Sequence, residues 1–331
     1  MKKYIFISFL LLLIIIVVLI FNQNKVDIKP KTYKSDFVEV NYPLFNNTKI
    51  DNYIWDYLNE KITNEKNLFI DYDYLINKSN ISLTFYTYSK EGNVLKTSKK
   101  DLVIDTKKSK ISVEDKKKIE DINLIDNINK KSTKLIALTF DDGPSYNTSR
   151  LIDILNKYNA KATFFVVGSR LKDNAQVLKK IKDSGMEIGN HTYSHKLLTK
   201  LSEDKINEEF SKTDNLVYEF TGKKPSIVRP SYGSVNKRIK KQADRPIIIW
   251  DIDTLDWKHH NSSYISNNVL NKAKDGDIVL MHDIYTATVN AVELLVPKLM
   301  NEGYQLVTVS ELFYYKNITL EKGNVYGSAH K

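Results

Sequence analysis

Short apolar segments and amphipathic segments alternate along the chain from Lys134 onward. The apolar segments, such as "KLIALTF" and "ATFFVVG", have the length of buried strands. The segments between them, such as "TSRLIDILNKYN", carry apolar residues three and four positions apart, as helices do. This alternation predicts an α/β domain with a parallel sheet and helices outside it. Its length, about 190 residues, suits a distorted (β/α) barrel of about seven parallel strands.

Residues 42–128 show a different pattern and are predicted to form a small α+β domain. Apolar residues at helical spacing, among them Ile54, Leu58 and Ile62, predict an amphipathic helix within 51–69. The segment "ISLTFYTYS" alternates and is rich in β-branched and aromatic residues, which predicts a strand. The pattern fits a wall-binding or positioning module and a packing domain or spacer equally well.

The N-terminus carries an apolar run from Tyr4 to Phe21, preceded by Lys2 and Lys3. Its roughly 18 residues are just enough to cross the hydrocarbon layer as a helix. Basic residues before the run predict that the remainder of the chain lies outside the cell. A cleaved signal peptide is the alternative, but no small-residue cleavage pattern follows Phe21. We therefore expect a single-pass signal anchor in the cell membrane.

The domain boundaries follow from these patterns. The signal anchor, or transmembrane helix, is placed at 1–24, and a polar, lysine-containing stalk at 25–41. The small α+β domain at 42–128 is followed by the α/β domain at 129–316 and a C-terminal tail at 317–331.

Composition narrows the chemistry. The chain has no cysteine, which excludes disulfides, thiolate zinc ligands and a thiol nucleophile. The net charge of +10 favours anionic surroundings such as a cell-wall polymer. The lysines are scattered in short groups and no arginine-rich arm is present, so we expect a solvated lysine-rich surface and no nucleic-acid partner.

Polar residues gather where the predicted strands of the α/β domain end. Parallel barrels place their chemistry at this rim, and a chance distribution of polar residues over loops explains the pattern poorly. The residues are Asp141, Asp142, His191, His195, Arg229, Asp253 and His282.

His191 and His195 are four residues apart. On a helix this spacing brings both imidazoles to one face, where they suit a metal. A carboxylate beside the first strand supplies a third ligand, and two histidines plus one carboxylate leave positions open for water. The same ligand types also hold iron in oxygenases, but Asp141, Arg229 and His282 would then have no role.

Five motifs of this domain occur in the order found in one enzyme family. They are "TFDDGP" from Thr139, "HTYSH" from His191, "RPSYG" from Arg229, "DTLDW" from Asp253 and "LMH" from Leu280. With them, the region from Lys134 to Leu312 resembles the NodB-like polysaccharide deacetylases of carbohydrate esterase family four. The anchor and small domain are similar in layout to membrane-anchored peptidoglycan N-acetylglucosamine deacetylases.

The resemblance implies a metal centre and a base. Asp142, His191 and His195 would bind a divalent metal, usually zinc in this family, with cobalt, manganese and nickel as alternatives. Asp141 would be the general base, and Arg229 would keep it ionised and aimed.

The resemblance also implies the remaining roles. The backbone N–H of Tyr232 would contribute to the oxyanion hole. His282 would be the general acid, held and tuned by Asp253. Tyr232, Trp257 and Leu280 would contact the substrate, with Trp257 and Leu280 around the acetyl methyl group.

One position departs from the family pattern. The third motif usually has proline where this chain has Ser231, which loosens the turn that aims the Tyr232 N–H. The expected activity is removal of acetyl groups from N-acetylglucosamine residues of wall peptidoglycan. Chitin or poly-N-acetylglucosamine, muramic residues and acetylated xylan are alternative substrates, and an inert wall-binding domain is the non-enzymatic alternative.

Overall fold

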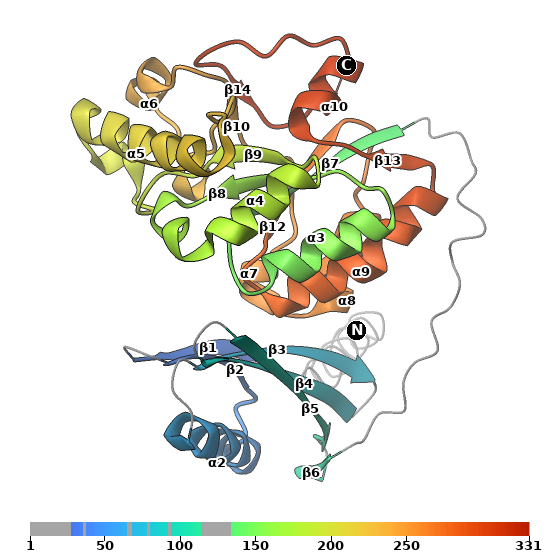
Figure 1. Cartoon of the computed structure of the whole chain (residues 1–331). Coiled ribbons are helices and arrows are strands. Elements are labelled where there is room, and N and C mark those ends of the chain that lie inside the picture. The colour runs from blue at the N-terminus through green and yellow to red at the C-terminus, as the bar shows by residue number, and fades with distance from the viewer. Residues whose placement is uncertain are drawn as a thin grey trace, which may run out of the picture.

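A computed structural model describes residues 28–35, 38–64, 68–77, 80–91, 94–106, 108–113 and 134–330. The predicted transmembrane helix over 1–24 lies outside these residues. Among the residues that are described, no helix has the length and apolarity needed to cross a membrane. The structure consists of a small sheet domain and a larger α/β domain, with the sheet of the first facing the helices of the second (Figure 1).

The first domain, the accessory domain, is a six-stranded sheet with one helix on one face (Figure 1). Its elements are β1 (Lys29–Lys34), β2 (Val38–Leu44), α2 (Thr48–Asn64), β3 (Leu68–Asn77), β4 (Asn80–Glu91), β5 (Val94–Asp105) and β6 (Lys110–Val113). The strands lie in chain order, and only the pair β2–β3 is parallel. A parallel pair needs a crossover connection, which α2 provides.

Helix α2 covers the sheet through one apolar face. Ile50, Ile54 and Leu58 are four residues apart, so they share that face, and all three are buried against strand residues such as Ile70 and Leu83. Burying each such side chain contributes about 1.5–3 kcal/mol. The predicted amphipathic helix is thus present in the accessory domain.

The predicted stalk over 25–41 is instead part of this sheet where it is described. Strand β1 pairs antiparallel with β2, with Lys29 opposite Leu44. All six β1 residues are exposed, because β1 is an edge strand. Charged residues are typical of exposed edges, since they oppose pairing with other chains. The polar composition of this segment therefore reflects an edge strand.

The α/β domain is built on parallel strands. They are β7 (Lys134–Asp141), β8 (Thr163–Val166), β9 (Glu187–Asn190), β10 (Ile247–Ile248), β11 (Ile252–Asp253), β12 (Asp277–His282), β13 (Tyr304–Leu306) and β14 (Val325–Tyr326). The order β11-β12-β7-β8-β9 is parallel throughout, and β13 also pairs with β7. Single-residue bridges join Val228 to β9 and to β10, so the row of parallel strands continues past β9 and curves into a ring. The predicted parallel α/β core is confirmed.

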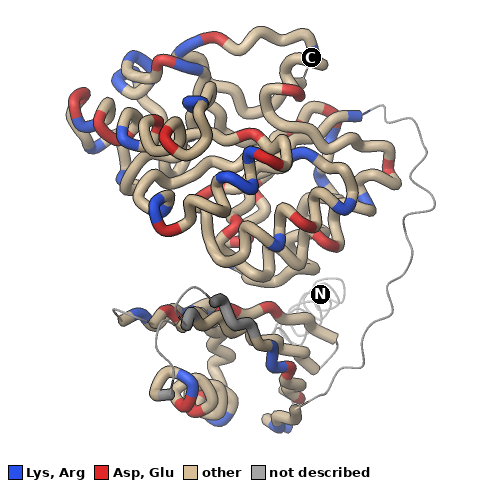
Figure 2. The backbone as a smooth tube through the Cα atoms, viewed as in Figure 1, with Lys and Arg blue, Asp and Glu red and all other residues tan. Residues whose placement is uncertain are grey.

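Helices pack outside this ring (Figure 1). They are α3 (Thr148–Lys157), α4 (Ala175–Asp183), α5 (Glu203–Thr221), α6 (Lys237–Gln242), α7 (Asp256–His259), α8 (Ser262–Leu270), α9 (Thr286–Asn301) and α10 (Val309–Tyr315). Leu151 of α3 and Leu295 of α9 are buried in one core with Phe140 and Val279 of the strands. Basic and acidic residues are interspersed along the outer helices in Figure 2, in keeping with a solvated charged surface. The predicted tail at 317–331 contributes β14, which pairs with β10.

Two aspartates of β3 join the accessory domain to the α/β domain. Asp71 Oδ2 accepts a hydrogen bond from the backbone N–H of Thr286 at 2.6 Å, and Asp73 Oδ1 accepts one from Ser262 N–H at 3.0 Å. Thr286 and Ser262 are the first residues of α9 and α8. A carboxylate at a helix N-terminus satisfies free N–H groups and opposes the positive end of the helix dipole. Both aspartates are buried, so they hold the two domains together.

Candidate active site

The polar residues predicted to share one rim do lie at the carboxyl ends of the parallel strands. Asp141 ends β7, Asp253 ends β11 and His282 ends β12. His191 directly follows β9, and Arg229 directly follows the bridge residue Val228. Parallel pairing brings these strand ends to one face of the barrel.

Asp142, His191 and His195 converge on one point. His195 Nε2 lies 3.1 Å and His191 Nε2 lies 3.5 Å from Asp142 Oδ1. One ligand atom from each residue lies within 4.8 Å of the others. The segment is not helical, because Thr192 and His195 have positive φ angles of 67° and 54°. A tight loop, rather than the predicted helix, therefore brings the two imidazoles together.

This cluster fits a bound cation. Asp142 Oδ1 is buried and has no well-aligned hydrogen-bond partner among the described residues. Burial alone would raise the pKa of Asp142, but the two imidazoles hold it well below its usual range. The other ring nitrogen of His191, Nδ1, lies 2.7 Å from the carbonyl oxygen of Arg229. Such a bond fixes the ring and leaves Nε2 free as a ligand, as in many metal sites.

Arg229 holds Asp141 in place. Its Nη1 donates hydrogen bonds to Asp141 Oδ1 at 2.7 Å and to Thr139 Oγ1 at 2.8 Å, and its side chain is completely buried. Further donors reach the carbonyl oxygens of Ile248 and Ile249. The predicted Arg229–Asp141 pair is present. The second carboxylate oxygen of Asp141, Oδ2, points toward His191 and lies 3.5 Å from His191 Nε2.

His282 is held by Asp256, and the prediction that Asp253 holds it is wrong. Asp256 Oδ1 lies 2.8 Å from His282 Nδ1, and Asp256 Oδ2 accepts the backbone N–H of His282 at 2.6 Å. Thr288 donates to the same Oδ2 at 2.7 Å. Asp253 accepts the backbone N–H of Leu255 at 2.8 Å. Leu255 has a φ of 57°, and this left-handed turn leads the chain from Asp253 into helix α7, which begins at Asp256.

The charge of Asp256 sets the protonation of His282. Burial alone would lower the pKa of His282, but the Asp256 carboxylate raises it to about 10. His282 is therefore protonated at neutral pH, with Nδ1–H donated to Asp256. An imidazolium held in this way has a proton on Nε2 to give to a substrate.

These groups open into a cavity of about 500 Å³. The predicted contact residues Tyr232, Trp257 and Leu280 all line it, as do Asp253 and His282. Tyr232 has a φ of 62°, and its ring packs on His195 with 4.7 Å between centroids. Ser231, which stands in place of the family's proline, shares a hydrogen bond with Thr192 at 2.9 Å.

Sequence patterns did not single out three residues of the site. They are Asp256, Trp250 and Tyr285. Asp256 and Asp253 both belong to the motif "DTLDW", so the motif contained two acids that could have held His282. Trp250 and Tyr285 had no pattern to separate them from other aromatic residues.

Comparison with known proteins agrees with this geometry. The model of the family described as polysaccharide deacetylase matches residues 128–245. That region includes Asp141, Asp142, both histidines of the cluster and Arg229. The chain belongs to the polysaccharide deacetylase family.

Individual deacetylases are similar to this chain over more than half of its length. The peptidoglycan-N-acetylmuramic acid deacetylase PdaC of Bacillus subtilis (strain 168) is 40% identical over 66% of this chain and 48% of its own length. The peptidoglycan-N-acetylglucosamine deacetylase PgdA of Listeria monocytogenes (strain 10403S) is 42% identical over 55% and 40%. The chain thus spans about half or less of the length of these two relatives.

A solved deacetylase-family structure shares the fold. The family 4 acetyl xylan esterase from Clostridium thermocellum, in complex with a cobalt ion, is 33% identical with a TM-score of 0.57. The match covers 59% of this chain and 98% of that one. This chain therefore matches nearly the whole length of that solved domain.

Proposed function

We propose that this chain is a divalent-metal-dependent N-deacetylase that releases acetate from N-acetylglucosamine residues of cell-wall peptidoglycan. One observation carries the proposal. The cluster of Asp142, His191 and His195 lies in the same cavity as an arginine-held aspartate, Asp141, and a protonated histidine, His282. An acetamide needs a polarised carbonyl, an activated water and a proton for its leaving nitrogen, and this cavity offers a group for each.

The metal would be held by Asp142, His191 and His195, with zinc the expected ion and cobalt, manganese and nickel the alternatives. When bound, a divalent ion polarises a carbonyl and lowers the pKa of water from 15.7 to about 7. Ligand type alone does not select among these ions.

Asp141 and Arg229 act on the attacking water. Arg229 occupies Asp141 Oδ1, which leaves Oδ2 to accept a proton as the water oxygen bonds to the acetyl carbon. The Tyr232 N–H is proposed to meet the developing oxyanion, a contact typically worth about 3 kcal/mol.

His282 completes the reaction. Its Nε2 proton passes to the acetamide nitrogen as the carbon–nitrogen bond breaks, so the sugar leaves as a neutral amine and the acyl group as acetate. Asp256 holds Nδ1 and stabilises the imidazolium until that transfer. Trp257 and Leu280 are proposed to enclose the acetyl methyl group.

The choice of sugar is open to one specific alternative. The Listeria relative is named for N-acetylglucosamine and the Bacillus subtilis relative for N-acetylmuramic acid. The proline after "DDG", Pro144, resembles the N-acetylglucosamine-acting members, which is why we propose that substrate. Muramic residues are the second candidate.

We further propose that the chain is anchored in the cell membrane with its catalytic domain facing the wall. The support is the apolar run from Tyr4 to Phe21 with Lys2 and Lys3 before it. Cell fractionation with a C-terminal tag, followed by protease accessibility in intact cells, tests this placement. Recovery of the full-length chain in the soluble fraction would contradict it.

The activity is tested on purified peptidoglycan and on N-acetylated chitooligosaccharides, with and without a chelator. We expect acetate release that depends on added metal. Glucosamine without its acetyl group should appear among the sugars when the product is digested with enzymes and without acid. Release of free muramic acid instead would move the assignment to the second candidate. No acetate from any acetylated glycan would refute the deacetylase proposal.

A further inference from the structure

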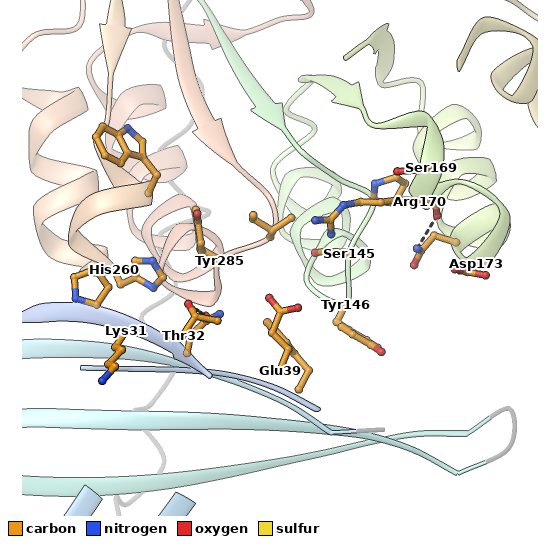
Figure 3. A pocket seen from close by; sticks show the side chains of 17 residues that line it. Lys31, Thr32, Glu39, Ser145, Tyr146, Ser169, Arg170, Asp173, His260 and Tyr285 are labelled. Carbon is orange, nitrogen blue, oxygen red and sulfur yellow. Dashed lines mark hydrogen bonds between the residues drawn. The ribbon is translucent and has the colours of Figure 1, made fainter. Parts of the chain in front are cut away.

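A groove of about 560 Å³ lies between the accessory domain and the rim of the α/β domain. One wall comes from the accessory strands, including Lys31, Thr32 and Glu39. The other comes from the loops after β7 and β8 and from the segments around His260 and Tyr285. Figure 3 shows Thr32 and Glu39 of the accessory sheet and Tyr146 and Arg170 of the α/β domain projecting into the space between the domains, whereas the side chain of Lys31 points away from it.

This groove is continuous with the catalytic cavity. Trp257 and Tyr285 line both spaces. Trp257 is 47% exposed, so one indole ring can contact ligands on both sides. The catalytic cavity of about 500 Å³ is in the range of small-molecule sites, about 300–1,000 Å³. A polymeric glycan must extend beyond such a cavity, and the groove lies in its path.

The groove lining fits an uncharged, hydroxyl-rich chain. Phe69 and Tyr146 add aromatic surface, and Thr32 and Asn41 add uncharged hydrogen-bonding groups. The charged side chains that face the groove are few, with Arg170 against Glu39 and Asp173. Aromatic faces with a few placed polar groups are typical of ligand sites, whereas a polyanion would need an excess of positive charge. The chemistry therefore favours sugar residues over an anionic polymer.

The two walls are held in a fixed relation. Tyr146 of the α/β domain stacks on Phe69 of the accessory sheet, with 5.5 Å between ring centroids. Tyr88 Oη donates a hydrogen bond to Asn147 Oδ1 at 3.0 Å, next to the same loop. Together with the Asp71 and Asp73 helix caps, these contacts make the groove a preformed feature. A preformed groove binds a chain without the entropic cost of ordering its walls.

We propose that this interdomain groove binds the glycan residues that flank the sugar being deacetylated, so that the accessory domain forms part of the substrate site. The proposal rests on the proposed deacetylase function, because it concerns the same substrate. It gives the accessory domain a role in recognising long glycan chains.

The test compares short and long substrates with the full chain. Thr32→Ala and Tyr146→Ala remove one group from each wall. Neither residue belongs to the catalytic machinery. Thr32 lies on an exposed edge strand, so its replacement should leave the fold intact. Thr48→Ala on α2 and Tyr314→Ala on α10 are matched controls, since both positions are exposed and neither lines the groove.

We expect both groove variants to lose about tenfold in kcat/KM on an N-acetylated hexasaccharide, mostly through KM, since such contacts bind ground state and transition state alike. Their kcat/KM on the disaccharide should stay at the wild-type value, and the two controls should match wild type on both. Parallel losses on both substrates, or no loss on the hexasaccharide, would overturn the groove proposal.

A binding measurement separates the two proposals. Hexasaccharide affinity is measured by calorimetry in an Asp141→Asn background, with and without Thr32→Ala. Weaker binding in the double variant supports the groove even if the wild-type chain releases no acetate, in which case the deacetylase proposal alone fails. Equal affinity with and without Thr32→Ala overturns the groove even if acetate is released.

Discussion

Each end of strand β12 (Asp277–His282) lies beside a cluster of aspartate and histidine residues, and the two clusters differ in hydrogen bonding and in the pKa of their acids. His282 at its carboxyl end faces the cavity that holds Asp142, His191 and His195. Asp277 at its amino end lies with Asp251 and His330. In each of these two trios, one ligand atom per residue lies within 4.8 Å of the others. Residue type and proximity alone would assign a metal to both ends.

The two clusters differ in how their polar atoms are satisfied. His330 Nε2 lies 2.5 Å from Asp277 Oδ1, Asp277 Oδ2 accepts the N–H of Lys274, and Asp251 Oδ1 accepts the N–H of Ile278. The amino-end cluster is thus a closed ion pair with an additional acid. Asp142 Oδ1 at the other end is buried with no well-aligned hydrogen bond among the described residues, although His195 Nε2 lies 3.1 Å from it.

The charge preferences differ as well. Partial burial, together with the neighbouring Asp277, raises the pKa of Asp251 to about 7, so this cluster favours a protonated acid. The pKa of Asp142 is instead lowered by the neighbouring imidazoles, so this acid stays ionised and keeps its anionic oxygens as ligands. The amino ends of barrel strands serve stability and the carboxyl ends serve chemistry. An unsatisfied lone pair on an ionised carboxylate therefore distinguishes the cation site from the ion pair.

His195→Ala should give the largest effect, because it removes one of three ligands from the carboxyl-end cluster. We expect the purified variant to lose its bound metal and to release acetate at the background rate. Metal content by mass spectrometry and acetate release on a chitooligosaccharide measure both losses. Retention of a full equivalent of metal with wild-type turnover would remove this cluster from the mechanism.

Asp141→Asn tests the base beside the cluster without removing a ligand. The amide keeps the shape of the side chain but cannot accept a proton from water, so kcat should fall by about 10²–10⁴-fold. Metal content should match wild type. Thr139→Val is the control, because Thr139 accepts a hydrogen bond from the same Arg229 nitrogen as Asp141. Full activity of Asp141→Asn would refute its assignment as the base.

The general arrangement of the site could be predicted because the strand pattern and the motifs can each be recognised in short segments of the sequence. Short apolar strands followed by Asp141, His191 and His282 place these residues on one rim whatever the loops do. The loop conformations were not predictable in the same way. Positive φ angles at Thr192, His195 and Leu255 decide how the histidines meet and which acid reaches His282.

The contact between the two domains could not be predicted from the sequence, for a different reason. In "LFIDYDYLIN" alternate residues point to opposite faces of the sheet, which implies that Asp71 and Asp73 share a polar face. Nothing in that pattern says that the face is buried against the N-termini of α8 and α9. Those partners lie 189 and 215 residues further along the chain.

Asp256→Asn tests how the carboxyl end of β12 is tuned. Asp256 stabilises the imidazolium and raises the pKa of His282, so its loss should lower that pKa. The acid must be protonated, and the alkaline limb of the kcat profile should therefore move to lower pH. We expect kcat at pH 7 to fall by about 10- to 100-fold, less than the full general-acid contribution of about 10²–10⁴-fold. Asp253→Asn is the matched control, and a shift of the limb in that variant alone would restore Asp253 as the partner.

His330→Ala should give the smallest effect, because it alters only the ion pair at the amino end of β12. His330 is partly exposed, and such pairs contribute about 1 kcal/mol or less to the free energy of unfolding. Metal content and kcat should equal those of wild type, while chemical denaturation should show a small loss of stability. If instead His330→Ala lost one equivalent of metal from a wild type that binds two, the amino-end cluster would be a second cation site. The contrast between an open ligand set and a closed ion pair would then fail as a criterion.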